Sequence, residues 1–344
     1  MPENAPPSTD CSVIRLFAEN LQLVANQLST GETGREAQPD FSIDDFWAKF
    51  THLTKALSAE TTKLCLGFNS APLPGPEEQN YFAGRMQQIV LALVSAYYGL
   101  PKAYGTLLRK STRLALLEVV SSLQSLLCSI VSSGIVGVSL EELTTTGEFW
   151  ACCDRVEKLP RTNAAALQVL TKQENGMVMD AYKEIKTAKD NESSQNATPE
   201  MLADDMESLT IDNRDEESWS ERDLTTVSAA MALIKTGSFV LKKMGPALKK
   251  EALNSLENVE AIDDLAELIR KISPSVDDFV LVLYAPMNYE FVKKEVANLH
   301  RDVRDLLEKC KDLHFCAETE QNWISFLSEA ADHNRKKTLD TIPN

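Results

Sequence analysis

The side chains best suited to chemistry are the seven cysteines and four histidines. Cys310, His314 and Cys316 stand close together, but two thiols and one imidazole are one ligand short of a four-coordinate zinc site. Cys152 and Cys153 could form a redox pair, but adjacent residues on a helix point to different faces and bridge only with strain. We therefore interpret these cysteines as packing residues, and the odd cysteine count without a CxxC spacing indicates a reducing compartment.

Paired carboxylates could supply a general acid and a general base. Asp263-Asp264 lies on a predicted solvated helix face, and Asp277-Asp278 falls at a predicted helix start, where acids favour the positive end of the helix dipole. The phosphate-binding, dinucleotide-binding, serine-nucleophile and zinc-protease motifs are missing, and no histidine stands in a ligand pattern. We expect no enzyme activity and no cofactor. A deep polar pocket at His300 or His314 would favour an enzyme instead.

Long helices are the elements that must position these side chains. The chain has 344 residues and 43% hydrophobic residues, and its 13 glycines and 14 prolines are too few for the many turns of a sandwich or barrel. Apolar residues recur every three or four positions, for example through Ile43, Phe46, Phe50 and Leu53. The pattern predicts an all-α protein built from antiparallel helix bundles, because each stripe is too weak to hold a helix alone.

Capping residues and prolines predict where several helices begin and end. Ser42, with Asp45 three positions later, is expected to cap one helix, and Asn163 another. Gly245-Pro246 is expected to end a helix. The run Ser273 to Asp278 is expected to stop one helix and start the next, with Ser275 as the cap.

A strongly acidic stretch divides the chain. Residues 190–223 hold twelve acidic residues against two arginines, a local charge of −10 within a chain whose net charge is −16. Such a stretch cannot bury enough apolar surface to fold alone. We predict an N-terminal helical bundle at 9–189, an acidic flexible linker at 190–222 and a smaller C-terminal helical bundle at 223–340.

The acidic linker also holds the candidate site residues. Its acids and its tryptophan form the candidate interaction segment, namely Asp204, Asp205, Glu207, Asp215, Glu216, Glu217 and Trp219. Thr198 precedes a proline, and Ser218 and Ser220 each have an acid three residues later, which makes these three the candidate phosphorylation sites.

The charge and the sequence patterns exclude several other partners. The acidic balance argues against direct nucleic-acid binding, and the N-terminus lacks the basic start and apolar run of a signal peptide. The longest apolar stretch, Ile89 to Leu100, is too short to span a bilayer. Residues 140–189 can be drawn as helix–loop–helix, but residues 139–148 contain no Lys or Arg to meet DNA.

Several runs, taken in order, resemble one family, the cyclin-D-binding proteins also called Grap- and cyclin-D-interacting protein, GCIP. The resemblance spans about Phe46 to Trp323 and rests on runs that begin at Ala96 (AYYGLPK), Thr106 (TLLRK), Phe149 (FWAC), Pro160 (PRTNAAAL), Trp219 (WSE), Ile272 (ISPSVDD) and Tyr284 (YAPM). None of these runs is a catalytic signature.

This resemblance implies an N-terminal bundle of the talin and vinculin-like kind and a smaller C-terminal helical part. It implies a negative regulator of cell-cycle progression that binds D-type cyclin and lowers cyclin-dependent kinase phosphorylation of the retinoblastoma protein. It further implies a Grap-type adaptor and helix–loop–helix transcription factors as partners, and a location in cytoplasm and nucleus. We expect a monomer or weak homodimer without membrane binding. The alternative function is a vinculin- or talin-like helical adaptor for cytoskeletal or signalling partners.

Overall fold

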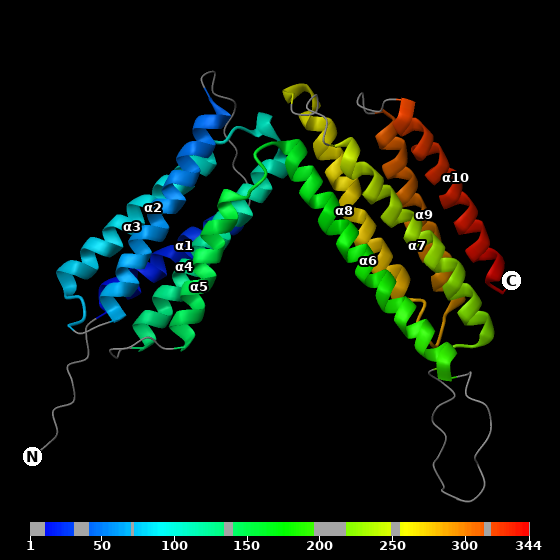
Figure 1. The fold of residues 1–344 in the computed structure, drawn as a ribbon, viewed down its shortest axis with the longest axis horizontal. Helices are drawn as coiled ribbons and strands as arrows, with labels where there is room; N and C mark the ends of the chain where they lie inside the picture. The colour runs from blue at the N-terminus through cyan, green and yellow to red at the C-terminus, as the bar shows by residue number, and fades with distance from the viewer. Residues whose placement is uncertain are drawn as a thin grey trace, which may run out of the picture. The chain divides into compact units, whose positions relative to one another are not determined.

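The computed structural model describes residues 11–30, 41–69, 72–133, 140–195, 218–248, 255–312 and 318–343. Within these ranges every regular element is a helix, so the predicted all-α class is confirmed (Figure 1). The chain divides into two compact units, unit 1 at Met1–Ala166 and unit 2 at Leu167–Asn344. The likeness to talin and vinculin bundles stays a prediction.

Unit 1 is a bundle of five long helices. They are α1 (Ser12–Ser29), α2 (Ile43–Asn69), α3 (Pro76–Gly99), α4 (Thr106–Ser133) and α5 (Leu140–Glu157), with a short 3-10 turn, η1 (Lys102–Tyr104), before α4. Helix α4 packs against α1 and α5, α2 packs against α3 and α5, and α1 packs against α3. The five helices therefore close a ring around one core.

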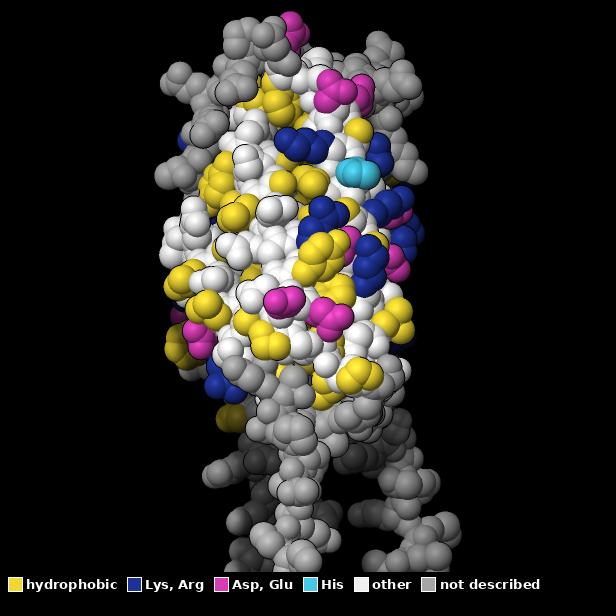
Figure 2. Space-filling view, turned by 90° about the vertical axis from the view of Figure 1, so that its left-hand side faces the viewer, with side chains coloured by type: hydrophobic (Ala, Val, Ile, Leu, Met, Phe, Trp, Pro, Cys, Tyr) yellow, Lys and Arg dark blue, Asp and Glu magenta, His cyan; other side chains and the backbone are white. Residues whose placement is uncertain are grey.

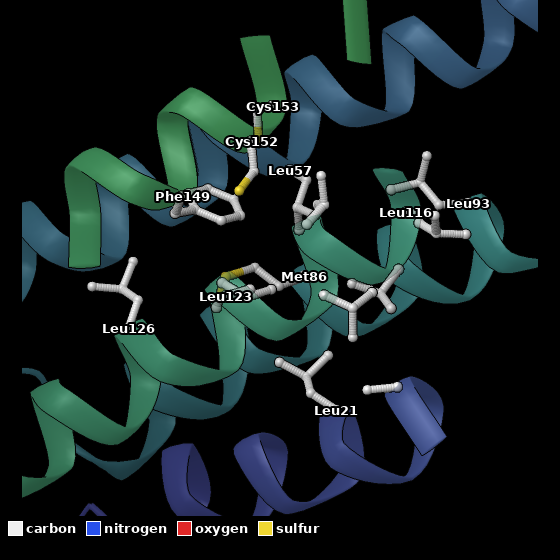
Figure 3. Close-up of a cluster of buried hydrophobic side chains, with 14 of the residues drawn as sticks. Leu21, Leu57, Met86, Leu93, Leu116, Leu123, Leu126, Phe149, Cys152 and Cys153 are labelled. Atoms are coloured by element: carbon white, nitrogen blue, oxygen red, sulfur yellow. The ribbon is translucent and has the colours of Figure 1, made fainter. Parts of the chain in front are cut away.

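One large side chain from each helix of unit 1 meets the others in this core. Figure 3 shows them pointing toward one another, and each is at most 1% exposed: Leu21, Leu57, Met86, Leu123 and Phe149. Burying such a side chain is worth roughly 1.5–3 kcal/mol. The apolar stripes that predict the helices are thus the surfaces that hold them together.

Local signals start α2 and α3. The backbone N–H of Asp45 donates to Ser42 Oγ at 3.2 Å, as the capping pattern predicts. Pro76 is the first residue of α3, where its missing N–H removes no helical hydrogen bond. The N–H of Gly75 donates to the carboxylate of Glu78 at 3.2 Å.

The predicted cap of α6 (Asn163–Gln195) is corrected by the structure. Thr162 caps this helix, because the N–H of Ala165 donates to Thr162 Oγ1 at 3.1 Å. The buried Asn163 side chain turns to α4 instead, where its Oδ1 accepts the N–H of Leu108 at 2.9 Å. This amide caps a helix distant in sequence, because the first-turn N–H groups of α4 have no partner within their own helix.

Unit 2 contains most of α6 and four further long helices. They are α7 (Glu221–Ala247), α8 (Val259–Leu281), α9 (Tyr289–Asp312) and α10 (Glu318–Thr341), with a 3-10 turn, η3 (Leu256–Asn258), before α8. Helix α7 packs against α10, and α9 packs against both α8 and α10.

Polar contacts attach α6 to unit 2. Gln168 Nε2 donates to the carbonyl of Leu248 at 2.7 Å, and Ser238 Oγ donates to Asn175 Oδ1 at 2.8 Å. The division of the chain after Ala166 therefore differs from the predicted bundle of 9–189. The predicted range assigns all of α6 to the N-terminal bundle, but the partners of these side chains lie beyond the acidic stretch.

The predicted helix end at Gly245-Pro246 is confirmed within one residue, because α7 ends at Ala247. The predicted break at Ser273 to Asp278 is wrong, because α8 runs through Pro274. Ser275 is therefore no cap, and its hydroxyl donates to Asp302 on α9. A proline inside a helix costs about 3 kcal/mol. One continuous buried stripe of α8 offsets that cost, since it includes Ile269, Ile272, Val276 and Phe279, all at 0% exposure.

Gly105 provides a test of the connection before α4. Its φ is 108°, and an added Cβ would lie 2.1 Å from Asn163 Cγ. We expect Gly105→Ala to lower the free energy of unfolding by more than about 2 kcal/mol. The cost of a strained backbone at this φ is added to the cost of displacing the Asn163 side chain that caps α4. Urea unfolding followed by circular dichroism measures this.

The matched control is Gly84→Ala, in the middle of α3, where an added Cβ meets nothing within 4 Å. It should raise the free energy of unfolding by about 0.5–1 kcal/mol. Equal effects of the two substitutions would contradict the assignment of Gly105 to a required turn.

Candidate interaction surfaces

The candidate chemical residues do not gather into a site in the part of the chain that the structure describes. No group of three or more His, Cys, Asp or Glu in that part could hold a metal ion. Cys310 is buried, while His314 and Cys316 lie outside the described residues. His300 Nε2 lies 2.7 Å from Asp332 Oδ1, and two further histidines are exposed, His52 and His333.

The adjacent cysteines of α5 are buried free thiols. Cys152 Sγ accepts from the guanidinium of Arg155 at 2.9 Å, and that guanidinium also pairs with Glu118 at 3.0 Å. Burial, followed by the charges of Cys152 and Asp154, raises the pKa of Cys153 to about 12. Cys153 is therefore a neutral thiol near pH 7 and a poor nucleophile, which agrees with a packing role.

The two predicted acid pairs, Asp263-Asp264 and Asp277-Asp278, do not act as paired acid and base groups in the described structure. Asp264 pairs with Lys309 of α9 at 2.7 Å, so it lies on a solvated face as predicted. Asp277 lies near the C-terminal end of α8, which corrects its predicted place at a helix start. Burial, then the charges of Asp278 and Glu184, raise its pKa.

Three of the runs that carry the family resemblance meet at one end of unit 1. The Arg109 side chain is fully buried, donates to the carbonyl of Leu100 and lies 5.3 Å from the centre of the Tyr97 ring. Trp47 Nε1 donates to the carbonyl of Arg161 at 3.1 Å. These runs hold the ends of α2, α3, α4 and α6 together, and this buried joint has a packing role.

The run that begins at Trp219 anchors the start of α7. Trp219 is only 8% exposed, and its Nε1 donates to the carbonyl of Leu283 at 2.7 Å. Its ring stacks on Tyr284 with 6.0 Å between the centroids, and Tyr284 Oη donates to Glu184 of α6 at 3.1 Å. We call these four residues the Trp219 anchor.

Directly after Trp219, a capping box begins α7. Asp223 N donates to Ser220 Oγ at 3.1 Å, and Ser220 N donates to Asp223 Oδ2 at 2.9 Å. Tyr289 Oη donates to Asp223 Oδ1 at 2.6 Å. Burial would raise the pKa of Asp223, but the hydrogen bonds from Tyr289 and Ser220 outweigh it and lower that pKa.

Most of the predicted interaction and phosphorylation residues lie outside the described residues. These are Thr198, Asp204, Asp205, Glu207, Asp215, Glu216 and Glu217. Trp219 is described and lies in the core, so it is not an exposed contact residue. Ser218 is exposed, and Ser220 is exposed with its hydroxyl engaged in the cap of α7.

The two helices of the drawn helix–loop–helix segment pack in different places. Helix α5 buries Phe149, Cys152 and Val156 in the core of unit 1. From Leu167 onward α6 belongs to unit 2. A dimer formed through α5 would therefore expose the core that this helix covers.

The outer side of α3 has exposed apolar and uncharged residues over most of its length. Tyr81 and Leu91 are 60% and 52% exposed, with exposed Gly84, Gln88 and Ser95 on the same side. No charged residue occurs from Met86 to Pro101. Figure 2 shows the side of unit 1 that carries α2 and α3, where apolar and uncharged side chains cover much of the surface. We call this the α3 face.

Two helices are long and apolar enough, by length and composition, to cross a membrane: α4 over Thr106–Ser132 and α7 over Glu221–Ala247. Each of them packs against two or more helices of its own unit. A core helix passes the same test, so this is weak evidence for a membrane span.

Comparison with known proteins gives matches along nearly the whole chain. The family model described as Grap2 and cyclin-D-interacting, N-terminal, matches residues 49–191, and the C-terminal model matches residues 202–308. The chain is 36% identical to the cyclin-D1-binding protein 1 homolog of Xenopus laevis, over 94% of this chain and 97% of that protein. It is 34% identical to the Danio rerio homolog, over 96% and 95% respectively. It is 30% identical to human cyclin-D1-binding protein 1, over 95% and 92%.

The cap of α7 predicts a pH dependence. Because folding lowers the pKa of Asp223 below its ordinary 3.8, this carboxylate stabilises the fold above that pH, and the stabilisation is lost as the pH falls through the folded pKa. Asp223→Asn should lower the free energy of unfolding by about 1 kcal/mol near neutral pH, and the difference from wild type should narrow below about pH 4.

Urea titrations of wild type and Asp223→Asn, near neutral pH and below about pH 4, measure the difference in the free energy of unfolding. Asp305→Asn is the control, because Asp305 is exposed on α9. A gap between wild type and Asp223→Asn that is constant with pH would show that the charge of Asp223 does not stabilise the cap.

Proposed function

The chain belongs to the family of Grap2- and cyclin-D-interacting proteins, and on that premise we propose that it binds a D-type cyclin and restrains cell-cycle progression. The single observation that carries the proposal is the match to the cyclin-D1-binding protein 1 homolog of Xenopus laevis over 97% of that protein. Because the match extends across both units, the proposal concerns the whole chain.

The mechanism that we propose is steric. The protein occupies a cyclin surface that the kinase or its substrate needs, and thereby lowers cyclin-dependent kinase phosphorylation of the retinoblastoma protein. Less phosphorylation of that protein damps the S-phase transcription that it restrains. Two helical bundles support this role, since they offer exposed helix faces to a partner.

The α3 face is our candidate for the cyclin contact in unit 1. Interface centres are depleted in charged residues and enriched in aromatic ones, because a charge must lose its water on docking. Tyr81 and Leu91 are exposed on this helix, and no charge follows from Met86 to Pro101. Charged residues flank Tyr81 at Glu77, Glu78 and Arg85, whereas Leu91 has none within four positions on either side.

The remaining parts of the proposal follow from the family. We propose a non-enzymatic protein without a cofactor, located in cytoplasm and nucleus, that is a monomer or weak homodimer. Its further partners are a Grap-type adaptor and helix–loop–helix transcription factors, without direct nucleic-acid or membrane contact. Phosphorylation at Thr198, Ser218 or Ser220 would deepen the negative charge of the acidic stretch.

Mixing the purified full chain with D-type cyclin and its kinase tests the function. We expect a stoichiometric complex in size-exclusion chromatography and reduced phosphate transfer to retinoblastoma protein as the chain is titrated. An actin pulldown and a vesicle pulldown run in parallel test the adaptor alternative. Full kinase output at a stoichiometric excess of the chain, with no complex formed, would refute direct inhibition.

A pair of surface variants tests the contact. Tyr81→Lys with Leu91→Lys should weaken cyclin binding at least about tenfold, since two buried interface side chains would become desolvated charges. The matched control is Leu16→Lys with Leu23→Lys, which places the same charges on exposed positions of α1. Isothermal titration calorimetry measures both, and equal affinities of the two variants would remove the α3 face from the interface.

A further inference from the structure

Beyond its first turn, the solvent side of α7 carries only positive charge. From Leu224 to Ala247 the helix has three lysines and no acid. Lys235, Phe239 and Lys242 follow one another at four and three positions, which places them on one stripe of the helix. Lys243 is also exposed, and Phe239 is 42% exposed. We call these four residues the lysine face.

Neighbouring helices flank the lysine face without covering it. Ser238 hydrogen-bonds to Asn175 of α6 at 2.8 Å, and Thr236 Oγ1 accepts from Asn334 of α10 at 2.9 Å. The stripe between these two contacts is exposed at Lys235. This lysine lies over the Phe239 ring, 5.9 Å from its centre. The exposed aromatic ring thus has one cation over its face.

The lysines of this face are unlike those of α9. Lys293 and Lys309 pair with Glu290 and Asp264, both at 2.7 Å. None of the three α7 lysines forms an ion pair among the residues that the structure describes. The three lysines of the lysine face are therefore free to pair with carboxylates from outside the described residues.

A complementary segment of the same chain joins α6 to α7. Residues 196–217 contain eight acids and one arginine, together with apolar residues at Leu202, Met206 and Leu209. Helix α6 ends at Gln195, and the Trp219 anchor and its capping box fix the other end at the start of α7. The segment is thus attached at one end to α6, which flanks the lysine face, and at the other end to α7, which carries it.

The length of the segment is sufficient. Lys235 lies about 21 Å along α7 from Glu221, at about 1.5 Å per residue. A chain of this length running out and back reaches about 36 Å when extended. The segment can therefore bring its acids to Lys235 and an apolar side chain to Phe239.

We propose that the lysine face of α7 is the docking site of the chain's own acidic segment, residues 196–217. Carboxylates pair with the lysines, and an apolar side chain of the segment covers Phe239. The shared chain gives a high effective concentration, so contacts that are weak between separate molecules suffice. A partner that recognises the acidic segment must displace it from α7. This inference does not depend on cyclin binding.

Zero-length carbodiimide cross-linking of the full chain tests the docking directly. We expect Lys235, Lys242 or Lys243 to be joined to acids of residues 196–217, and these products to fall at least fivefold in about 1 M salt, where charges are screened beyond about 3 Å. Acids of the segment that join Lys311 of α9 as often as the α7 lysines would overturn the proposal.

Peptide competition gives a second measurement on the folded protein. In one variant a Gly/Ser linker of equal length replaces residues 196–217, and the probe is a fluorescent peptide with the sequence of those residues. Fluorescence anisotropy should show binding to this variant and at least tenfold weaker binding to the full chain, whose own segment occupies the site. Equal binding to both, or binding to neither, would refute occupation by the chain itself.

Charge reversal identifies the lysines responsible. Lys235→Glu, Lys242→Glu and Lys243→Glu together in the linker variant should weaken peptide binding at least tenfold. The control reverses three exposed lysines of unit 1, Lys49, Lys110 and Lys158, which changes the net charge equally. Circular dichroism confirms that each variant is folded, and equal losses in both triple variants would show a non-specific charge effect and overturn the proposal.

Discussion

Burial of one apolar stripe per helix is the interaction on which the rest of this structure depends. An isolated helix of this length is marginal in water, because ordering its backbone opposes the gain from its hydrogen bonds. In unit 1 five helices each contribute a side chain, such as Leu57 and Phe149, to one closed core. The same burial keeps α8 continuous through Pro274, where local preference favours a break.

Buried polar groups then determine how the helix ends meet. Arg109 is fully buried, and the Leu100 carbonyl and the Tyr97 ring face its charge, which offsets part of the cost of burying it. Trp219 likewise keeps its N–H satisfied inside unit 2 through the Leu283 carbonyl. The runs that carry the family resemblance are concentrated at these two places. The residues that carry the resemblance therefore hold helix ends together, and the exposed helix faces remain available for partners.

Helix α6 is assigned differently by sequence and by structure. The N-terminal family model extends to residue 191, whereas the compact unit 1 ends at Ala166. Ser273 Oγ of α8 donates to the buried Glu174 Oε2 at 2.5 Å, and Gln168 reaches the Leu248 carbonyl. The helix is thus continuous with one bundle in sequence and packed on the other. In the described structure the drawn helix–loop–helix segment is divided between two cores.

Spacing and capping residues are enough to predict most helices, because the period of apolar residues and the Ser42 cap act within a few residues. The acidic stretch between the bundles is visible for the same reason, as a local excess of charge. Three features could not be read in this way: the burial of Trp219, the turn of Asn163 toward α4, and the attachment of α6 to unit 2. Each depends on a partner far away in sequence, such as Leu283, Leu108 or Leu248. A single side chain carries no signal of which distant group will satisfy it, so only the packed helices decide these contacts.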